Sequence, residues 1–239
     1  MLAKRRIQTR ESVYQSIKSY LLSGQMGPGR KLTQESLAGK LRVSRTPVRE
    51  ALHRLESEGL VSRSDTGGFL VPDLSVHELD ELFDLRSVLE GFSVRFACNG
   101  ISEKKILFLE EVVEKSQEAH SNGEAEEIFF WNTEFHDTIH NITSERKRFK
   151  SLITNMREYV LRYRMDTLYH LDLAQKSINA HRKILLAFRL KDPNLAEYTM
   201  RRHIQESKED AMIITFGRDY EKLLGYPAAG DNLTCMVLD

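Results

Sequence analysis

The sequence predicts a mainly α-helical protein in which three helices and a β-hairpin precede an all-helical bundle. Apolar residues recur at helical spacing along most of the chain, which predicts amphipathic helices. The run LVSRSDTGGFLVP, residues 60–72, differs because it places two β-rich segments around an Asp-Thr-Gly-Gly turn. Pro72 and Asp73 end this run and the pattern beyond them is helical, so we expect a domain boundary there.

The length and composition indicate a soluble globular protein. The chain has 239 residues, of which 41% are hydrophobic and 29% are charged. No apolar run approaches the roughly 18 residues that a membrane-spanning helix needs, so we expect no membrane partner. Cys98 and Cys235 are too few for a disulfide framework or a Cys-rich zinc module, and a reducing cytoplasm is the expected location.

Charge is distributed unevenly, although the net charge of the chain is zero. Residues 1–72 contain 13 Lys and Arg against 6 Asp and Glu, a net charge of +7, and the rest of the chain balances this with −7. A basic segment joined to an acidic one points to a polyanion as the partner of the first. We therefore expect a nucleic-acid-binding domain at residues 1–72, a helical domain at 73–217 and a C-terminal tail at 218–239.

The N-terminal domain divides into short helices with recognisable caps. Apolar spacing predicts helices at residues 11–24, 33–41 and 44–59, with Thr33 and Ser44 as the N-caps of the second and third. A tight connection separates these two helices. Helix, turn, capped helix and Gly-tipped hairpin follow one another in the order of a winged helix-turn-helix.

The third predicted helix carries the candidate DNA-contacting groups. Its apolar residues lie on one face, so Arg45 and Arg49, one turn apart, must point away from the core. Arginine can donate two bonds to guanine, hydroxyl groups suit phosphate oxygens, and glycines let the backbone approach a sugar-phosphate wall closely. A solvent-facing basic helix in an ordinary bundle is the alternative. The candidate DNA-binding residues are Ser44, Arg45, Thr46, Arg49, Arg63, Gly67 and Gly68.

The stretch LTQESLAGKLRVSRTPVREALHRLESEGLV resembles the winged helix-turn-helix signature of the GntR family of bacterial transcription regulators. The resemblance covers about residues 9–72. It implies a homodimer on palindromic operator DNA, with Arg45, Thr46 and Arg49 reading the operator and the glycines of the wing tip touching the minor groove. Glu35 stands where some relatives have a further DNA-contacting arginine, a departure that concerns the second helix.

Six helices are predicted in the second domain. Asp192 and Pro193 mark the start of the last one, because Asp is a favoured N-cap and Pro a favoured first helical residue. The predicted ranges are 75–99, 102–121, 123–143, 145–168, 171–190 and 193–215.

The phrase LFDLRSVLEGFSVRFA is similar to the opening helix of the ligand-sensing FCD domain in the FadR-like branch of that family. Many members of the branch bind a metal with Asp or Asn, a histidine four residues later and two histidines on separate helices. Three imidazoles and one oxygen suit zinc, nickel or another first-row divalent ion. The ligand set that the resemblance implies here is Asn132, His136, His181 and His203.

Arg86 and Glu90 fall on one helix face among leucines. A buried arginine needs an anionic partner, so one interpretation is an internal salt bridge. The other, which the resemblance supports, is that Arg86 binds a small carboxylate metabolite bidentately and that binding releases a repressor from its operator. Glu90 and, on a later helix, Arg164 are further candidates for effector binding.

The stretch FHDTIH allows a different function, that of a metallohydrolase. His136 and His140 would bind zinc and Asp137 would be the general base, as in a His-Glu-x-x-His helix. Aspartate is one methylene shorter than the glutamate of that motif, and a hydrolase leaves the N-terminal domain unexplained. We therefore expect a regulator and not an enzyme. A metal-free effector pocket for an acyl-coenzyme-A-like ligand is the other alternative.

Overall fold

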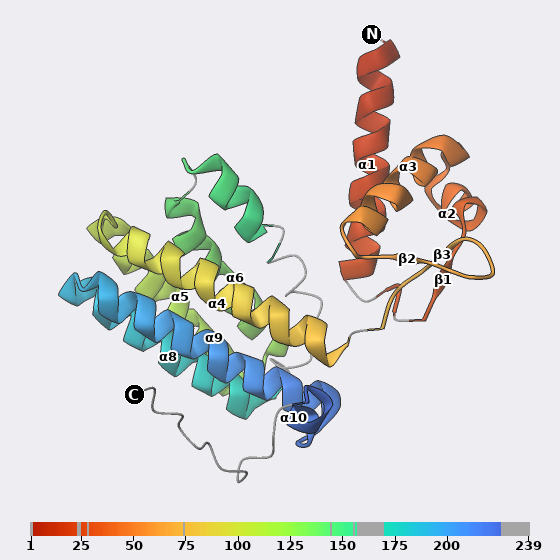
Figure 1. Ribbon diagram of the computed structural model, residues 1–239. Coiled ribbons are helices and arrows are strands. Elements are labelled where there is room, and N and C mark those ends of the chain that lie inside the picture. Colours follow the sequence, from red (N-terminus) through yellow and green to blue (C-terminus); the bar gives the residue numbers. More distant parts are fainter. Residues whose placement is uncertain are drawn as a thin grey trace, which may run out of the picture. The chain divides into compact units, whose positions relative to one another are not determined.

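The computed structural model divides into two compact units, Met1–Ser75 and Val76–Asp239 (Figure 1). Both units are dominated by helices, which confirms the predicted fold class. The structure describes residues 2–22, 25–27, 29–73, 75–143, 145–154, 156 and 170–225.

The first unit contains the three predicted helices and the predicted hairpin, and it adds one strand. Its elements are α1 (Leu2–Leu22), β1 (Lys31–Leu32), α2 (Gln34–Leu41), α3 (Arg45–Ser57), β2 (Ser62–Arg63) and β3 (Phe69–Leu70). The unpredicted strand, β1, pairs antiparallel with β3 and gives the sheet the order β1-β3-β2. Two residues are too few to show a periodicity, so only the pairing partner could reveal this strand.

The core of the first unit lies between α1 and α3. Ile17 and Leu21 of α1 are fully buried with Leu52 and Leu55 of α3. Burying this face of α3 leaves its opposite face, and its N-terminal end, in solvent. Thr33 caps α2 as predicted, because its side chain accepts a hydrogen bond from the Ser36 backbone N–H at 3.2 Å.

The second unit is a helical bundle. Its elements are α4 (Val76–Cys98), α5 (Glu103–Asn122), α6 (Ala125–Ile142), α8 (Leu171–Leu190), α9 (Pro193–Phe216) and the short α10 (Tyr220–Leu223). Residues 147–154 are also helical and begin the helix predicted at 145–168, of which 157–168 lie outside the described residues. α10 lies within the segment predicted as a tail without periodicity, where a single turn leaves no repeat to detect.

The packing of the bundle follows the apolar faces of its helices. α4 packs against α9, while α5 contacts both α6 and α8 (Figure 1). Asp192 caps α9 through its side chain, which accepts hydrogen bonds from the backbone of Asn194 and Leu195, both at 3.0 Å. Among the described helices, none is long and apolar enough to cross a bilayer.

Candidate functional site

The N-terminal end of α3 presents the predicted DNA-contacting side chains to solvent. Ser44 occupies the N-cap position, but its hydroxyl makes no capping hydrogen bond. Ser44, Arg45, Thr46 and Arg49 are all exposed. Arg49 forms no ion pair within the described parts of the chain, so its guanidinium is available to a nucleic acid.

Arg45 is held by a residue of the neighbouring helix. Its Nη2 lies 2.5 Å from the Glu35 Oε1 of α2, and about two thirds of each side chain remains exposed, 69% for Arg45 and 67% for Glu35. Sequence reasoning identified Glu35 only as a departure from relatives. The ion pair joins α2 to the N-terminal end of α3, and the Glu35 carboxylate reduces the net positive charge there.

The two glycines of the wing are required by the fold itself. Gly67 has φ +81° and Gly68 has φ +85°, which are left-handed conformations that L-residues adopt at a cost. A Cβ at Gly68 would also lie 3.0 Å from the Leu32 carbonyl oxygen of β1. Lys31 holds the tip, because its Nζ donates to Thr66 Oγ1 at 2.9 Å. This exposed lysine is a cation of the wing that sequence reasoning missed.

Arg63 is engaged within the first unit. Its Nε donates to Glu56 Oε1 of α3 at 2.7 Å, and His53 Nδ1 lies 3.1 Å from the other oxygen of the same carboxylate. These hydrogen bonds, first that of Arg63 and then that of His53, lower the pKa of Glu56. Arg63 therefore joins the wing to α3, although 71% of its side chain remains exposed.

In the second unit, three helices bring three histidines together. His136 of α6, His181 of α8 and His203 of α9 are all buried, and one nitrogen from each lies within 4.8 Å of the others. His136 Nε2 is 3.2 Å from His181 Nε2, and the three ring centroids are 5.0–5.4 Å apart. Since the residues come from positions 45 and 22 apart in the chain, the cluster depends on the packing of the bundle.

Asn132 lies one turn before His136 on α6 and is also buried. Its Nδ2 donates to Ser177 Oγ of α8 at 2.8 Å. This bond fixes the orientation of the amide, so that the carbonyl oxygen is the atom a metal ion would use. The chemistry of the donor set, three imidazoles and one amide oxygen, fits a divalent first-row ion.

Glu90 of α4 lies next to His136 and not only next to Arg86. Its Oε2 is 2.5 Å from His136 Nδ1, and its Oε1 accepts a hydrogen bond from Arg86 Nε. Burial opposes ionisation of this carboxyl, but the charge of Arg86 and the contacts with His136 and His140 outweigh it and hold the pKa well below its usual range. A carboxylate bound to Nδ1 directs the Nε2 lone pair of His136 toward the other histidines.

Of the two interpretations predicted for Arg86, an internal salt bridge and a contact to a carboxylate ligand, the structure contains the salt bridge. The internal ion pair with Glu90 is present, and both side chains are buried. The Nη1 of Arg86 is buried as well, but it has no hydrogen-bond partner among the described residues. A buried cationic donor without a partner is costly, so this nitrogen is suited to an anionic ligand. The other candidate arginine, Arg164, lies outside the described residues.

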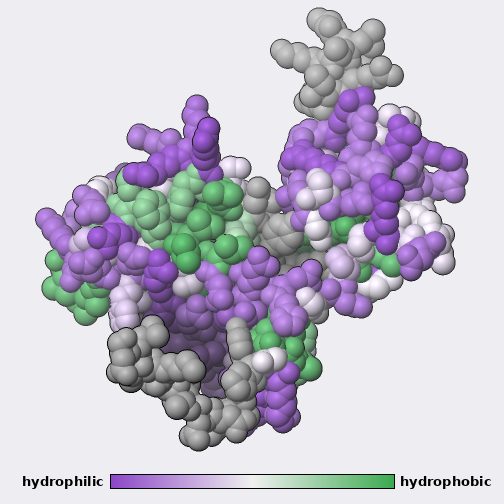
Figure 2. All heavy atoms as spheres, viewed as in Figure 1, coloured by the Kyte–Doolittle hydropathy of each residue, from purple (hydrophilic) through white to green (hydrophobic). Residues whose placement is uncertain are grey.

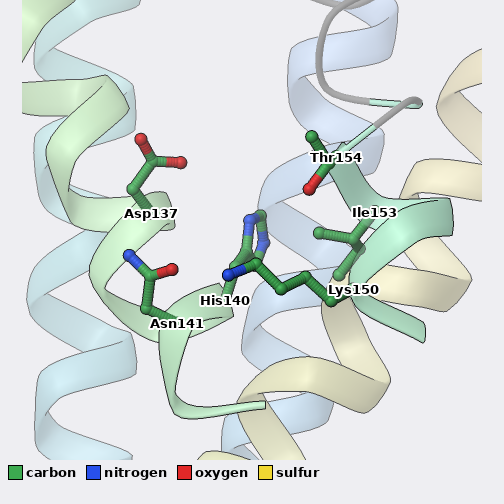
Figure 3. A pocket seen from close by; sticks show the side chains of 6 residues that line it. All are labelled: Asp137, His140, Asn141, Lys150, Ile153 and Thr154. Carbon is green, nitrogen blue, oxygen red and sulfur yellow. The ribbon is translucent and has the colours of Figure 1, made fainter. Parts of the chain in front are cut away.

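The Nε2 atoms of the two histidines of FHDTIH have different neighbours. His136 Nε2 faces His181, whereas His140 Nε2 lies 3.3 Å from Glu90. Asp137 lines a pocket with His140 (Figure 3). Glu90, His136 and His140 form a second group of buried ligand atoms within 4.8 Å, which the sequence did not suggest because Glu90 is on a different helix.

Comparisons with known proteins match both units. Residues 9–71 match the family of bacterial regulatory proteins named gntR, and residues 81–206 match the FCD domain. The HTH-type transcriptional regulator YdhC of Bacillus subtilis is 27% identical over 197 residues, which cover 82% of this chain and 88% of that one. The HTH-type transcriptional repressor RspR of Escherichia coli is 24% identical over 199 residues, with coverage of 83% and 87%.

The HTH-type transcriptional regulator McbR of Escherichia coli resembles the chain in sequence and in structure. The sequences are 35% identical over 129 residues, which span 54% of this chain and 58% of that regulator. The structure of McbR aligns with a TM-score of 0.65 at 28% identity, covering 83% of this chain and 94% of that one. The matched domains and relatives are transcriptional regulators and not enzymes.

Proposed function

Since the chain belongs to the GntR family of bacterial regulatory proteins and carries an FCD domain, we propose that it is a homodimeric repressor that a small organic acid releases from its operator. The observation that carries the proposal is the buried cluster of His136, His181 and His203, with the ion pair of Arg86 and Glu90 beside it. A buried polar site in a domain attached to a DNA-binding domain is suited to sensing a ligand. Because bacterial operator DNA lies in the cytoplasm, the proposed function places the protein there.

For DNA recognition, α3 would enter the major groove with its N-terminal end. Arg49 and Arg45 are exposed there and can each donate two bonds to a guanine. The hydroxyls of Ser44 and Thr46 are suited to DNA phosphate oxygens. Lys31 and the wing tip would contact the neighbouring groove or the sugar-phosphate backbone of the DNA. A palindromic operator then requires two copies of α3, hence a dimer.

An exposed apolar stripe of α4 supports the homodimer. Leu85, Val88 and Phe92 are 46%, 51% and 37% exposed and follow one face of the helix at spacings of three and four residues. Figure 2 shows hydrophobic side chains gathered over α4 and the helix at residues 147–154, where Leu152 is also exposed. A patch of this kind on a protein that must act as a pair fits a second copy of the same chain.

A divalent ion, zinc or nickel, would be held by Asn132, His136, His181 and His203. When bound, the ion supplies a positive charge that attracts a carboxylate. Glu90 keeps His136 in the orientation that the ligand set needs, and Arg86 offers its unpaired Nη1 to the same anion. An acid that favours the form of the dimer unable to bind DNA would release the operator.

The repressor assignment follows the relatives. RspR, which is similar over most of both chains, is named a transcriptional repressor. By the same linkage, an acid that prefers the DNA-binding form would act as a co-repressor and lower the apparent Kd for operator.

The experiment measures fluorescence anisotropy of labelled operator DNA with the full-length, zinc-loaded protein. A panel of small carboxylic acids is added, and at least one is expected to raise the apparent Kd for operator by tenfold or more. The variant Arg86→Met should keep operator binding and lose the response. If no acid shifts operator affinity, or if Arg86→Met responds as the wild type does, the effector site is not at Arg86.

A further inference from the structure

The helices α2, α3, α5 and α8 end in the same backbone arrangement, the Schellman motif, in which one residue has a positive φ. Glycine occupies this position after α3 and α5, where Gly59 has φ +75° and Gly123 has φ +73°. After α2 and α8 the position holds a long cation instead, Arg42 with φ +54° and Lys191 with φ +53°. Within the described residues, no other residue besides glycine has a positive φ.

The motif at the end of α2 does not need the arginine side chain. The Arg42 N–H donates to the Gly39 carbonyl at 3.3 Å, and the Val43 N–H donates to the Ala38 carbonyl at 3.1 Å. Both bonds are made by the backbone, so a glycine at position 42 would form them without bringing a Cβ close to a carbonyl oxygen. Backbone strain of this kind is concentrated at binding sites, where the side chain has a use of its own.

A contact with the helix dipole is one contribution that Arg42 and Lys191 share. A cation near the C-terminal end of a helix interacts favourably with the carbonyl groups exposed there. Because both residues end a helix, this contribution does not distinguish them. Their surroundings do, since Lys191 belongs to the second unit and is followed directly by Asp192, the N-cap of α9.

Arg42 is an exposed cation of the turn between α2 and α3 (Figure 1). It precedes Ser44, the N-cap of α3, by two residues, which span at most about 7 Å. The one acidic residue of α2, Glu35, forms its ion pair with Arg45. Arg42 itself takes part in no ion pair within the described ranges of the chain. Its charge is therefore uncompensated beside the end of α3 that is proposed to contact DNA.

We propose that Arg42 contacts a phosphate of the DNA backbone at the edge of the groove that α3 enters. This inference rests on the proposed contact of the α3 end with DNA. The turn lies before the helix end that would reach the bases, and the sugar-phosphate backbone borders the groove, so a phosphate is the group within reach. A guanidinium can donate two hydrogen bonds to a phosphate. Arg42 thus adds affinity and no sequence preference.

Fluorescence anisotropy with the full-length protein tests the proposal with the variant Arg42→Gly. Operator and scrambled duplexes are titrated between about 50 and 200 mM salt. Loss of one phosphate contact should weaken both complexes by a similar factor, roughly three- to tenfold at the lowest salt, and reduce the salt slope by about 0.9. Arg42→Lys keeps the charge and should retain the wild-type slope.

The matched control is Lys191→Gly, which removes a cation from the same motif in the other unit. Both glycine variants should raise the midpoint of urea unfolding, because both relieve a left-handed L-residue. Lys191→Gly should leave the affinity for both duplexes and the salt slope unchanged. In Arg42→Gly, by contrast, weaker DNA binding should accompany the higher midpoint.

Three results would overturn the inference. The first is wild-type affinity and slope in Arg42→Gly. The second is an equal loss of slope in Lys191→Gly, which would assign the effect to net charge. The third is a loss of slope that Arg42→Lys shares, which would assign it to the shape of the turn.

Failure of the inference can be told from failure of the proposed DNA contact. If Arg49→Ala lowers the preference for operator while Arg42→Gly keeps the wild-type slope, the end of α3 contacts DNA and the turn does not. If neither substitution changes binding to either duplex, the contact of the α3 end with DNA is rejected together with the inference.

Discussion

The N-terminal end of α3 and the histidine cluster use polar side chains in opposite surroundings. At α3 the polar groups are exposed, and water solvates them. In the cluster His136, His181 and His203 are 2%, 1% and 3% exposed, so protein groups or a ligand must replace water. The first arrangement costs the fold almost nothing, whereas the second is stable only if each group finds a partner.

This difference in burial determines which side chains can be removed from each site without changing the packing of the protein. A side chain at the α3 end can be removed without unfolding the domain, so its loss should appear in DNA binding alone. Removing a member of the buried cluster changes metal binding and packing together. The two sites can therefore be separated by substitutions whose effects fall on one function each.

The largest effect is expected for His203→Ala. Losing one of three imidazoles should reduce the metal content after dialysis to less than about a tenth of that of the wild type, since second-sphere changes alone cost about 10- to 100-fold in affinity. Inductively coupled plasma mass spectrometry measures the content. Operator affinity without effector should stay within about twofold of the wild type if the two sites are independent.

His77→Ala is the control for this substitution, because His77 is an exposed histidine at the start of α4. It should retain the metal. Retention of the metal by His203→Ala together with its loss in His140→Ala would contradict the assigned ligand set and favour the pairing of the hydrolase alternative.

The next largest effect is expected for Arg49→Ala. A bidentate contact to a base contributes about 1–3 kcal/mol of discrimination, so operator affinity should fall roughly 5- to 150-fold while affinity for unrelated DNA falls much less. Competition binding with operator and scrambled duplexes measures both. Arg30→Ala removes an exposed arginine that is not part of α3 and serves as the control. Unchanged sequence preference in Arg49→Ala would exclude this residue from base reading.

Gly68→Ala should act on stability. The left-handed φ of +85° and the 3.0 Å approach to the Leu32 carbonyl make a Cβ unfavourable there. We expect the free energy of unfolding of the first unit to fall by about 1–3 kcal/mol. Gly39→Ala in α2 is a matched control with open space around it, and it should be stabilising by about 0.5–1 kcal/mol. Urea unfolding monitored by circular dichroism compares the two variants.

The smallest effect is expected for Glu35→Gln. Removing the carboxylate beside Arg45 raises the net charge at the N-terminal end of α3 by one, and this end is the one proposed to contact DNA. Affinity for unrelated DNA should rise a few-fold at low salt, and the salt dependence of binding should steepen by about one unit of slope. Titrations between about 50 and 200 mM salt measure the slope. An unchanged slope would show that Glu35 lies away from the phosphates.

Much of the fold could be predicted because it follows from local patterns. The main helices of the bundle, α4, α5, α6, α8 and α9, have 18–24 residues or about five to seven turns, so their apolar spacing is visible. Thr33, Asp192 and Pro193 mark starts that the structure confirms. The strand β1 could not be predicted. Two residues, Lys31 and Leu32, show no pattern by themselves and become a strand only through β3.

The candidate site could be predicted only in part. The histidine ligand set was inferred from a family resemblance, and its assignment to a metal stays a prediction that the geometry supports. Two contacts had no sequence signal. Glu90 of α4 precedes His136 by 46 residues in the chain, and its carboxylate contacts the imidazole of His136. Glu35 of α2 forms an ion pair with Arg45 of α3, across the turn between the two helices. Side-chain direction, which decides both, depends on how helices cross.

The sequence by itself determined the helical class of the protein, the basic N-terminal and acidic C-terminal segments and the exposure of the polar N-terminal end of α3, because these follow from composition and from apolar spacing within one or two turns. Only the tertiary structure decided that Glu90 lies between Arg86 and His136, that His140 lies beside Glu90 and lines a pocket, and that Gly68 is needed against Leu32. These contacts join residues distant in the chain, and the packing that brings them together is a property of the whole bundle or sheet.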